Sequence, residues 1–359
     1  MKILFITTND INKSFGGAIG SKRNYDFLCK YFGSENVDVL LLKERPNKTL
    51  KEKLIKNINK YFTCSQFDIR QLKGIDFSRY NLIFNDNSVI GKINKYLKEN
   101  GFKNKIITYF HNCEYSLYHQ LYKNSSILIR YILYRIVKVN EKAALKYSDS
   151  CVILNQRDLN EIKRIYKCSF NYKIIPVSIK DTYKEAKIKE ELNVRPIFTF
   201  IGSYFRPNVD GIMWLIENVL PFVNIKLRII GMNMDKLSSQ IRNNNVEILS
   251  NIPDLDEYIR VSDCMIYPIF EGSGMKLKTC EALMYGKNII GTPEAFMGYD
   301  IENFNEIGAC CHNSDEFIDA INNFNLPRYN VVSRRIFQEK YSYDASYKEF
   351  LSLMKDMKL

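Results

Sequence analysis

Short apolar runs alternate with longer amphipathic stretches along the whole chain. Most of these apolar runs stop at a polar residue, a glycine or a proline, which is typical of strands buried in a parallel sheet, and we expect the run at 37–42 to be buried on both faces. The predicted strands are 2–8, 37–42, 81–84, 105–109, 150–155, 172–175, 197–201, 226–230, 246–249, 264–267, 288–291 and 307–310. The predicted helices are 22–32, 48–60, 126–147, 156–166, 211–223, 279–286 and 345–355.

This alternation predicts an α/β fold with two Rossmann-like, doubly wound parallel-sheet domains that face each other across a cleft. A chain of 359 residues is too long for one ordinary core, which also favours two domains. The linker-like run KDTYKEAKIKEELNVRP interrupts the alternation between the halves. We therefore expect an N-terminal domain at 1–172, a C-terminal domain at 173–340 and a last helix at 341–359 that packs back toward the N-terminal domain.

One run in the second half, PIFEGSGMKLKTCEALMYGKNIIGTP, combines groups that suit an anionic ligand. Gly272 and Gly274 follow a strand end, where backbone without side chains lets N–H groups approach an anion closely. Lys276 and Lys278 supply positive charge. Glu281 lies in the helix that follows, where a carboxylate accepts hydrogen bonds from sugar hydroxyls. The run therefore indicates a nucleotide diphosphate whose ribose lies beside the helix.

Two strand ends in the first half carry further candidates. The first strand leads into a loop with Gly16, Gly17 and Gly20, which lacks a full G-x-G-x-x-G and fits an active-site loop better than a dinucleotide site. The strand at 105–109 ends in a polar cluster that contains His111. Because α/β sheets place ligand groups at the carboxyl ends of their strands, His111 is a functional candidate, with a structural histidine as the alternative.

The triplet Asp254-Leu255-Asp256 has the form of a metal-binding D-x-D motif. It directly follows Pro253 at a predicted helix start, where acidic side chains act as caps. We therefore expect no metal at this triplet and no cofactor elsewhere in the protein.

The formal charge of +12 is unevenly distributed. Residues 1–172 hold 30 Lys and Arg against 15 Asp and Glu, a balance of +15, and the remainder holds 22 against 25, a balance of −3. This asymmetry favours an anionic partner for the first half, such as a membrane surface, a phosphorylated lipid or nucleic acid. The basic amphipathic helix at 48–60 fits an anionic lipid surface. The alternative is a lysine-rich solvated face, with 48–60 as an ordinary surface helix.

Nothing in the sequence predicts a membrane span or a signal peptide, because the apolar runs are short or interrupted by charge and MKILFITTND reads as a first strand. The nine cysteines include no C-x-x-C pair, which favours reduced structural thiols over disulfides or a metal site. We therefore expect a cytoplasmic protein, peripheral on the cytoplasmic face of a membrane where its basic half binds lipid.

Four stretches spread over nearly the whole chain form a recognisable set: FGGAIGSKR, YFHNCEYS, FIGSYFRPNVDGIMWLIENVLP and EGSGMKLKTCEALMYGKNIIGTPEAFMGYD. Together they resemble the retaining, nucleotide-sugar-dependent glycosyltransferases of the GT-B architecture, specifically glycosyltransferase family 4. The last two stretches are the specific ones, since the G-x-G-x-K-x-K-x-x-E-A-L pattern is rare outside this group. The resemblance implies transfer of a sugar from a UDP- or GDP-sugar to a glycan or lipid-linked acceptor, in cell-surface polysaccharide or glycoconjugate synthesis.

The resemblance also implies roles for individual residues. Glu281 matches the family's carboxylate that holds the ribose hydroxyls, and Lys276 matches the basic residue on the pyrophosphate. Gly272 and Gly274 match the loop under the donor sugar. Glu271 resembles the first Glu of the paired-glutamate signature, although the nine residues between the pair exceed the family spacing.

The chain departs from many relatives where these have an arginine and a lysine and it has Ser203 and Asn208. It resembles a subgroup with the sequence R-P-N, which assigns Arg206 to the diphosphate. His111 matches the family's histidine near the reacting centre. The implied catalytic residues are His111, Arg206 and Lys276. The implied donor-binding residues are Gly16, Gly17, Gly202, Glu271, Gly272, Ser273, Gly274, Met275, Lys276 and Glu281.

The implied chemistry agrees with these residue types. Breaking the bond between the sugar and the phosphate builds negative charge on the leaving group, which fixed cations and N–H groups stabilise. Arg206, Lys276 and the amides of the glycine loop can do this without a metal. In the family the leaving phosphate is thought to accept the acceptor's proton, so no side-chain base is required.

Other functions fit the sequence less well. A sugar-nucleotide epimerase of the same architecture needs several acid and base groups in its cleft, and only His111 is well placed for such a role. A basic protein that binds nucleic acid would carry interleaved aromatic residues on a recognisable module, and the sequence has none, so we expect no nucleic-acid partner. A non-catalytic partner subunit is disfavoured by the presence of Glu281 and Lys276.

Overall fold

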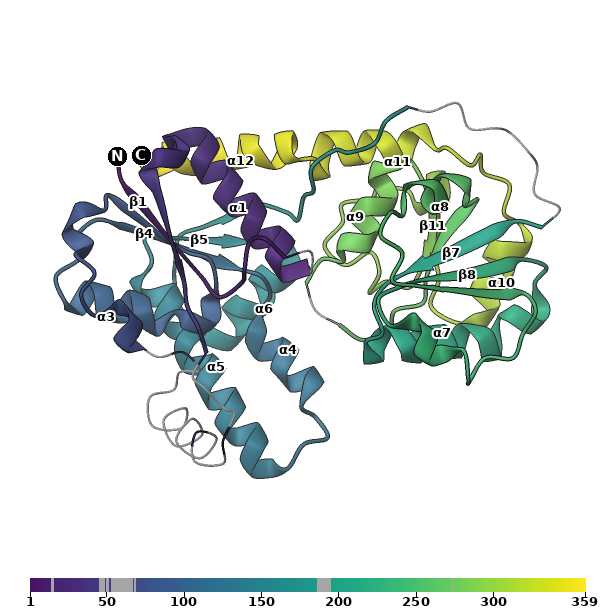
Figure 1. Ribbon diagram of the computed structural model, residues 1–359, viewed down its shortest axis with the longest axis horizontal. Helices are drawn as coiled ribbons and strands as arrows, with labels where there is room; N and C mark the ends of the chain where they lie inside the picture. The colour runs from purple at the N-terminus through teal and green to yellow at the C-terminus, as the bar shows by residue number, and fades with distance from the viewer. Residues whose placement is uncertain are drawn as a thin grey trace. The chain divides into compact units, whose positions relative to one another are not determined.

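A computed structural model of the chain describes residues 1–13, 16–44, 49, 52, 67, 69–185, 195–272 and 274–359 (Figure 1). The predicted helix at 48–60, apart from residues 49 and 52, and the candidate Ser273 lie outside this part. The chain divides into two compact units, each with its own parallel sheet. The predicted α/β class with two Rossmann-like domains is therefore confirmed.

The first unit comprises Met1–Pro176 and Tyr347–Leu359. Its parallel sheet has the order β2-β1-β3-β4-β5-β6, and helices connect most of the strands. The strands are β1 (Ile3–Thr7), β2 (Val37–Leu41), β3 (Leu82–Asn85), β4 (Lys105–Phe110), β5 (Ser150–Ile153) and β6 (Tyr172–Ile174). The helices are α1 (Gly16–Phe32), α3 (Lys92–Glu99), α4 (Glu114–Leu121), α5 (Ile127–Tyr147), α6 (Gln156–Tyr166) and, from Tyr347 on, α12 (Tyr343–Asp356).

The end of the chain packs on the first unit. The rings of Phe27 in α1 and Phe350 in α12 lie 5.7 Å apart. Lys173, in β6, forms an ion pair of 3.3 Å with Glu349. Because β6 pairs with β5, the strand at the predicted domain boundary belongs to this unit.

The prediction that the strand at 37–42 is buried on both faces is wrong. β2 lies at the edge of its sheet, so only one side of it pairs with another strand. Val39 and Leu41 are exposed. Asp38, on the opposite face, forms ion pairs with Lys2 and Arg79. An apolar run at a sheet edge looks the same in sequence as a central one, because only the strand order distinguishes them.

The second unit, Val177–Ser346, is built on a parallel sheet with the order β12-β11-β10-β7-β8-β9. The strands are β7 (Ile197–Ile201), β8 (Lys226–Gly231), β9 (Val246–Ser250), β10 (Cys264–Tyr267), β11 (Asn288–Gly291) and β12 (Gly308–Cys310). The helices are α7 (Arg206–Asn218), α8 (Asp256–Val261), α9 (Leu277–Met284), α10 (Ser314–Asn322) and α11 (Val331–Ile336), which continues into a π-helical turn at Phe337–Tyr341.

The helix predicted at 211–223 instead begins at Arg206 and ends at Asn218. Pro207 stands in its first turn, where a fixed φ favours the helix and no N–H is lost. The helix continues through Gly211 because only hydrogen fits there: a Cβ would lie 1.8 Å from the carbonyl oxygen of Pro268. α7 therefore packs directly against the chain that leaves β10.

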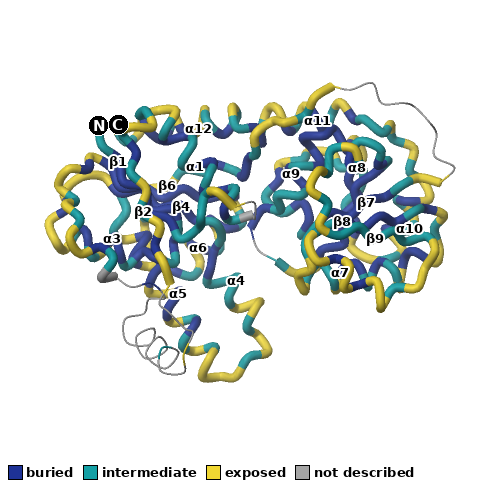
Figure 2. Tube along the Cα trace, in the orientation of Figure 1, coloured by how far each residue is buried: buried dark blue, intermediate teal, exposed yellow. Residues whose placement is uncertain are grey.

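Apolar strands form the core of each unit (Figure 2). β1 is buried at every residue and β7 at all but its first. Burying one such apolar side chain contributes about 1.5–3 kcal/mol to the free energy of folding. The two sheets thus give rigid frames whose strand ends position the polar residues that follow.

Candidate functional site

The strand order of the second sheet indicates where a ligand would bind. From β7 the chain continues to β8 and β9 on one side, and β10 then starts the other side. In doubly wound sheets the loops at the carboxyl ends on either side of such a reversal diverge and leave a crevice for ligands. The segments that follow β7 and β10 are those that contain Gly202 and the predicted glycine and lysine run.

After β7 the backbone passes very close to the neighbouring strand and to two side chains. The N–H of Gly202 donates to the carbonyl of Ile230 at 2.9 Å. A Cβ at Gly202 would lie 2.8 Å from Lys278 Nζ and 3.0 Å from Asn208 Nδ2. Gly231 is restricted as well, since a Cβ there would lie 1.7 Å from the carbonyl oxygen of Gly202. Gly231 thus has to be glycine because its close neighbour is backbone, whereas the close neighbours of Gly202 are side-chain atoms.

After β10 the loop adopts conformations that favour glycine. Gly274 has φ of +64°, in the left-handed region. Gly272 faces the side chain of Lys276, whose Nζ would lie 3.0 Å from a Cβ there. Glu271 is exposed, whereas Met275 is buried and its sulfur accepts a hydrogen bond of 3.4 Å from the N–H of Val177. Met275 therefore anchors the loop.

Lys276 is engaged within the protein. Its Nζ lies 2.7 Å from Glu294 Oε1 and donates to the carbonyl of Gly274 at 3.1 Å. Both side chains of the ion pair are largely buried, with 13% and 16% exposed. Glu294 follows β11, so this ion pair joins the loop after β10 to the segment after β11.

Lys278, in the first turn of α9, reaches the start of α7. Its Nζ donates to Asn208 Oδ1 at 2.9 Å and lies 4.3 Å from the centre of the Phe200 ring. Burial, with a smaller contribution from Lys276, lowers the pKa of Lys278 to about 7. A hydrogen bond between residues 70 positions apart thus joins the first turns of two helices.

Glu281 lies on the same helix as Lys278, three residues further along. Burial raises the pKa of its carboxyl. In the residues that the structure describes, its carboxylate has no hydrogen bond or ion pair. A partly buried carboxylate without a protein partner is typical of a group that binds a ligand.

Arg206 is the first residue of α7 and its side chain is 66% exposed. Its Nε lies 3.2 Å from Asp210 Oδ2, one turn along the helix. Exposed pairs of this spacing contribute only about 0.3–0.5 kcal/mol, so little free energy holds the guanidinium in this rotamer.

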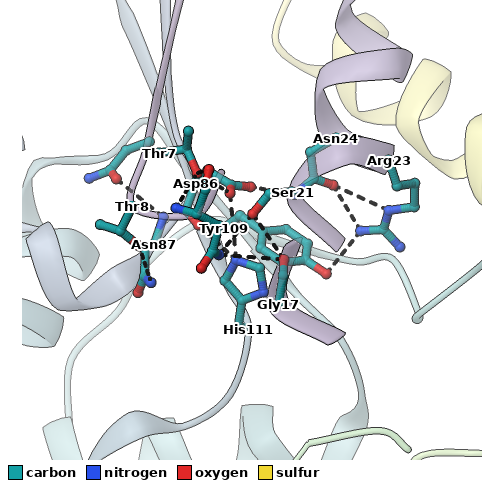
Figure 3. A network of polar contacts seen from close by, with 12 residues as sticks. Thr7, Thr8, Gly17, Ser21, Arg23, Asn24, Asp86, Asn87, Tyr109 and His111 are labelled. Carbon is teal, nitrogen blue, oxygen red and sulfur yellow. Dashed lines mark hydrogen bonds and ion pairs between the residues drawn. The ribbon is translucent and has the colours of Figure 1, made fainter. Parts of the chain in front are cut away.

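The first sheet reverses its order between β1 and β3, and polar residues gather at their carboxyl ends (Figure 3). Asp86, which follows β3, is fully buried and accepts hydrogen bonds from Thr7 Oγ1 at 3.0 Å and Asn24 Nδ2 at 2.7 Å. The carbonyl of Gly17 accepts a hydrogen bond of 3.0 Å from Ser21 Oγ. Gly16 is the first residue of α1.

His111 joins this cluster from the end of β4 (Figure 3). Its Nε2 lies 2.9 Å from the carbonyl oxygen of Asp86 and 3.6 Å from the Asp86 carboxylate. A carbonyl only accepts, so Nε2 carries a proton, and in the neutral ring Nδ1 is left as an acceptor. Gly20 packs beside the ring, since a Cβ there would lie 3.4 Å from His111 Cε1.

A buried glutamate that the sequence did not reveal supports the segment after His111. The carboxylate of Glu141, in α5, accepts the N–H groups of Glu114 and Tyr115 at 2.9 and 3.1 Å, at the start of α4. It also accepts from the hydroxyl of Tyr166 at 2.6 Å. Burial raises the pKa of Glu141 to about 8. Its position in a long amphipathic helix carried no local signal for this role.

The candidates therefore fall into two groups, one in each unit. In the first unit the structure brings together Gly17 and His111 around Asp86, and in the second it brings together Gly202, the loop after β10 and α9. The sequence analysis missed Asp86 and Glu294, and it named Asn208 only as a departure from the relatives and not as a partner of Lys278. Lys278 was counted among the positive charges for the anionic ligand but was given no individual role.

A comparison with protein-family models matches part of the second unit. Residues 195–324 match the family model of the group 1 glycosyl transferases. This part of the chain contains the turn after β7, the loop after β10 and α9. No curated protein matches the chain by sequence.

Solved structures resemble the whole chain. Sucrose-phosphate synthase from Thermosynechococcus elongatus has a TM-score of 0.73 and 16% identity, with 99% of this chain and 98% of that chain covered. Anabaena Alr3699/HepE in complex with UDP and glucose has a TM-score of 0.67 and 13% identity, with 99% of this chain and 100% of that chain covered. The lipopolysaccharide outer core galactosyltransferase WaaB, in its apo form, has a TM-score of 0.65 and 12% identity, with both chains fully covered. The likeness shows the GT-B fold.

Proposed function

We propose that the protein is a glycosyltransferase that moves a sugar from a nucleotide-diphosphate sugar to a glycan or lipid-linked acceptor, with retention of configuration. The observation that carries this proposal is Glu281, a partly buried carboxylate without a protein partner in the described residues, beside the glycine loop at the reversal of the second sheet. The match of residues 195–324 to the group 1 glycosyl transferases supports it.

The donor in this proposal is held by the second unit. Glu281 binds the ribose hydroxyls, and the loop with Gly272 and Gly274 lies under the donor sugar. Alr3699/HepE, which resembles this chain in fold, has been solved with UDP-glucose, and this makes UDP-glucose the first donor to test. The exposed Arg206 turns from Asp210 to the diphosphate at little cost, because the ion pair it leaves is weak.

The chemistry follows from the charges in this unit. Cleavage of the bond between the sugar and the phosphate leaves negative charge on the diphosphate, and fixed positive groups lower the barrier when they face that charge. Arg206, Lys276 and the backbone N–H groups of the glycine loop are the candidates. With such groups no metal is required, and the leaving phosphate takes the acceptor's proton. His111, in the first unit, is proposed to act near the reacting centre.

The acceptor in this proposal is bound by the basic first unit at an anionic membrane surface. Besides the balance of +15 over residues 1–172, α5 begins with exposed apolar side chains. Ile127 is 83% and Leu128 68% exposed, Ile129 is exposed as well, and Arg130 comes next. Exposed apolar side chains next to basic ones suit an interface with anionic lipid. Among the described helices, none has the length and apolar character needed to cross a bilayer.

The donor proposal is tested with a panel of UDP- and GDP-sugars, by thermal shift and by hydrolysis of the nucleotide sugar in the absence of acceptor. We expect at least one sugar nucleotide to raise Tm, with slow release of the nucleotide. No shift and no release across the panel would contradict the proposal. The configuration of the transferred sugar, read by NMR once an acceptor is found, tests retention.

The membrane proposal is tested by sedimentation with vesicles that contain anionic or only zwitterionic lipid. We expect binding to anionic vesicles that weakens with salt, and a loss of binding in the double variant Ile127→Ser/Leu128→Ser. An exchange of the exposed Phe222 for Ser, in the second unit, is the matched control. Absence of binding at low salt would rule the membrane out as the partner.

A further inference from the structure

Among the described residues of the second unit, burial lowers the pKa of two lysines, Lys278 and Lys287, to about 7. The ammonium of Lys287 donates to three backbone carbonyls, those of Arg260, Ser262 and Arg328, at 2.6, 2.9 and 3.2 Å. An ammonium has three N–H donors, so all of them have partners. Lys287 thus has the surroundings of a structural lysine that ties three segments together.

Lys278 has different surroundings. In the described part of the chain its ammonium has one hydrogen bond, to Asn208 Oδ1, and otherwise faces the rings of Phe200 and Tyr267 at 4.3 and 5.7 Å. No carboxylate there pairs with it. The residue as a whole is half-buried, and burial lowers the pKa of its ammonium. A desolvated cation with unused N–H donors is suited to an anionic ligand.

Lys276, the lysine first assigned to the diphosphate, differs again. Glu294 lies 2.7 Å from its Nζ, and the pair is largely buried, so its charge is already balanced within the protein. For Lys276 to bind a phosphate, this ion pair has to be weakened. Lys278, by contrast, has no carboxylate partner in the described residues, so its positive charge at the reversal of the second sheet is not balanced in this way.

We propose that Lys278 is the cation that binds the diphosphate of the donor, and that it takes up a proton from solvent when the diphosphate arrives. The inference rests on the proposed function and assigns a residue to its donor site. Gly202 leaves the space that this requires, because a Cβ there would lie 2.8 Å from Lys278 Nζ. Asn208 then orients the ammonium from α7.

The proton uptake follows from the charges around Lys278. Because burial and Lys276 lower its pKa to about 7, the side chain is partly neutral in the free protein near neutral pH. On α7, Arg206 and Asp210 form an exposed pair of their own, and on α9 Glu281 lies about one turn away. A bound diphosphate adds negative charge beside the ammonium, which raises the pKa again.

The test measures the affinity for UDP and GDP by calorimetry between pH 7 and 9, in two buffers of different ionisation enthalpy. For the wild type we expect the affinity to fall by up to about tenfold per pH unit above pH 7, with proton uptake from the buffer. Lys278→Met is expected to lower the affinity about 10- to 100-fold at pH 7 and to abolish the slope. Lys278→Arg, charged at every pH, is expected to bind without the slope.

Two controls separate binding from a structural role. Lys276→Met is expected to retain the pH slope, and Lys287→Met is expected to lower Tm, whereas Lys278→Met leaves Tm unchanged or raises it. If the wild type and Lys278→Met bind UDP with equal affinity and with the same dependence on pH, this inference is overturned, while the proposed function is not. Binding of neither nucleotide by the wild type overturns the proposed function, and the inference with it. If Lys278→Met fails to fold, the wild type and Lys278→Arg are compared instead. A pH slope of affinity in the wild type that is absent from Lys278→Arg supports the inference, and equal slopes overturn it.

Discussion

The substitution Glu281→Gln tests the donor site most directly. It keeps the shape of the side chain and removes its charge and one acceptor oxygen. Burial raises the pKa of Glu281, which means that folding disfavours the ionised form. At neutral pH, where the unfolded chain is ionised, the glutamate therefore costs stability. Replacing it with Gln is expected to keep or raise the free energy of unfolding.

The expected loss is in binding. A hydrogen bond from a hydroxyl to a charged group contributes about 1.5–3 kcal/mol, and the affinity changes tenfold for each 1.4 kcal/mol. Loss of one such bond lowers the affinity for UDP by about 10- to 150-fold. Glu281→Ala removes both acceptor oxygens and is expected to abolish sugar transfer while the fold stays intact. Glu257→Gln, at an exposed position of α8 in the same unit, is the matched control.

Calorimetry with UDP and with 2′,3′-dideoxy-UDP assigns the bond to the ribose. If Glu281 accepts from the ribose hydroxyls, the wild type binds the dideoxy nucleotide more weakly than UDP, and Glu281→Gln distinguishes the two much less. The losses from the two changes are then not additive. Additive losses, or an affinity for UDP that Glu281→Gln leaves intact, would refute the assignment of Glu281 to the ribose.

Three further substitutions test the rest of the site. His111→Ala is expected to lower the rate of transfer at least about 100-fold without changing UDP affinity, as initial rates and calorimetry would reveal; an unchanged rate would remove it from the mechanism. Gly202→Ala places a Cβ 2.8 Å from Lys278 Nζ and is expected to weaken UDP binding with little change in Tm; equal binding would mean that the ammonium moves aside freely. Gly211→Ala places a Cβ 1.8 Å from the carbonyl oxygen of Pro268, so denaturant unfolding should register a loss of about 1–3 kcal/mol, and an unchanged midpoint would contradict the close packing of α7.

Much of the fold was predictable because it depends on local patterns. The apolar runs that became β1, β4 and β7 are recognisable as buried strands, since each is short, apolar and followed by polar residues or glycine, and the run that became β10 ends at a proline. The edge position of β2 was not predictable, because the order of strands depends on which crossovers pack together. The early start of α7 had a local signal in Pro207, which the sequence analysis passed over.

The sequence by itself determined which residues stand at the strand ends, and with them the glycine turns, the lysines and Glu281. Only the tertiary structure decided how these groups are paired. Lys276 meets Glu294, and Lys278 meets Asn208 across 70 residues, because the packing of β7, β10 and β11 brings distant segments together. The charge that a lysine offers to a ligand depends on whether such packing supplies a counter-charge, and no local pattern encodes that.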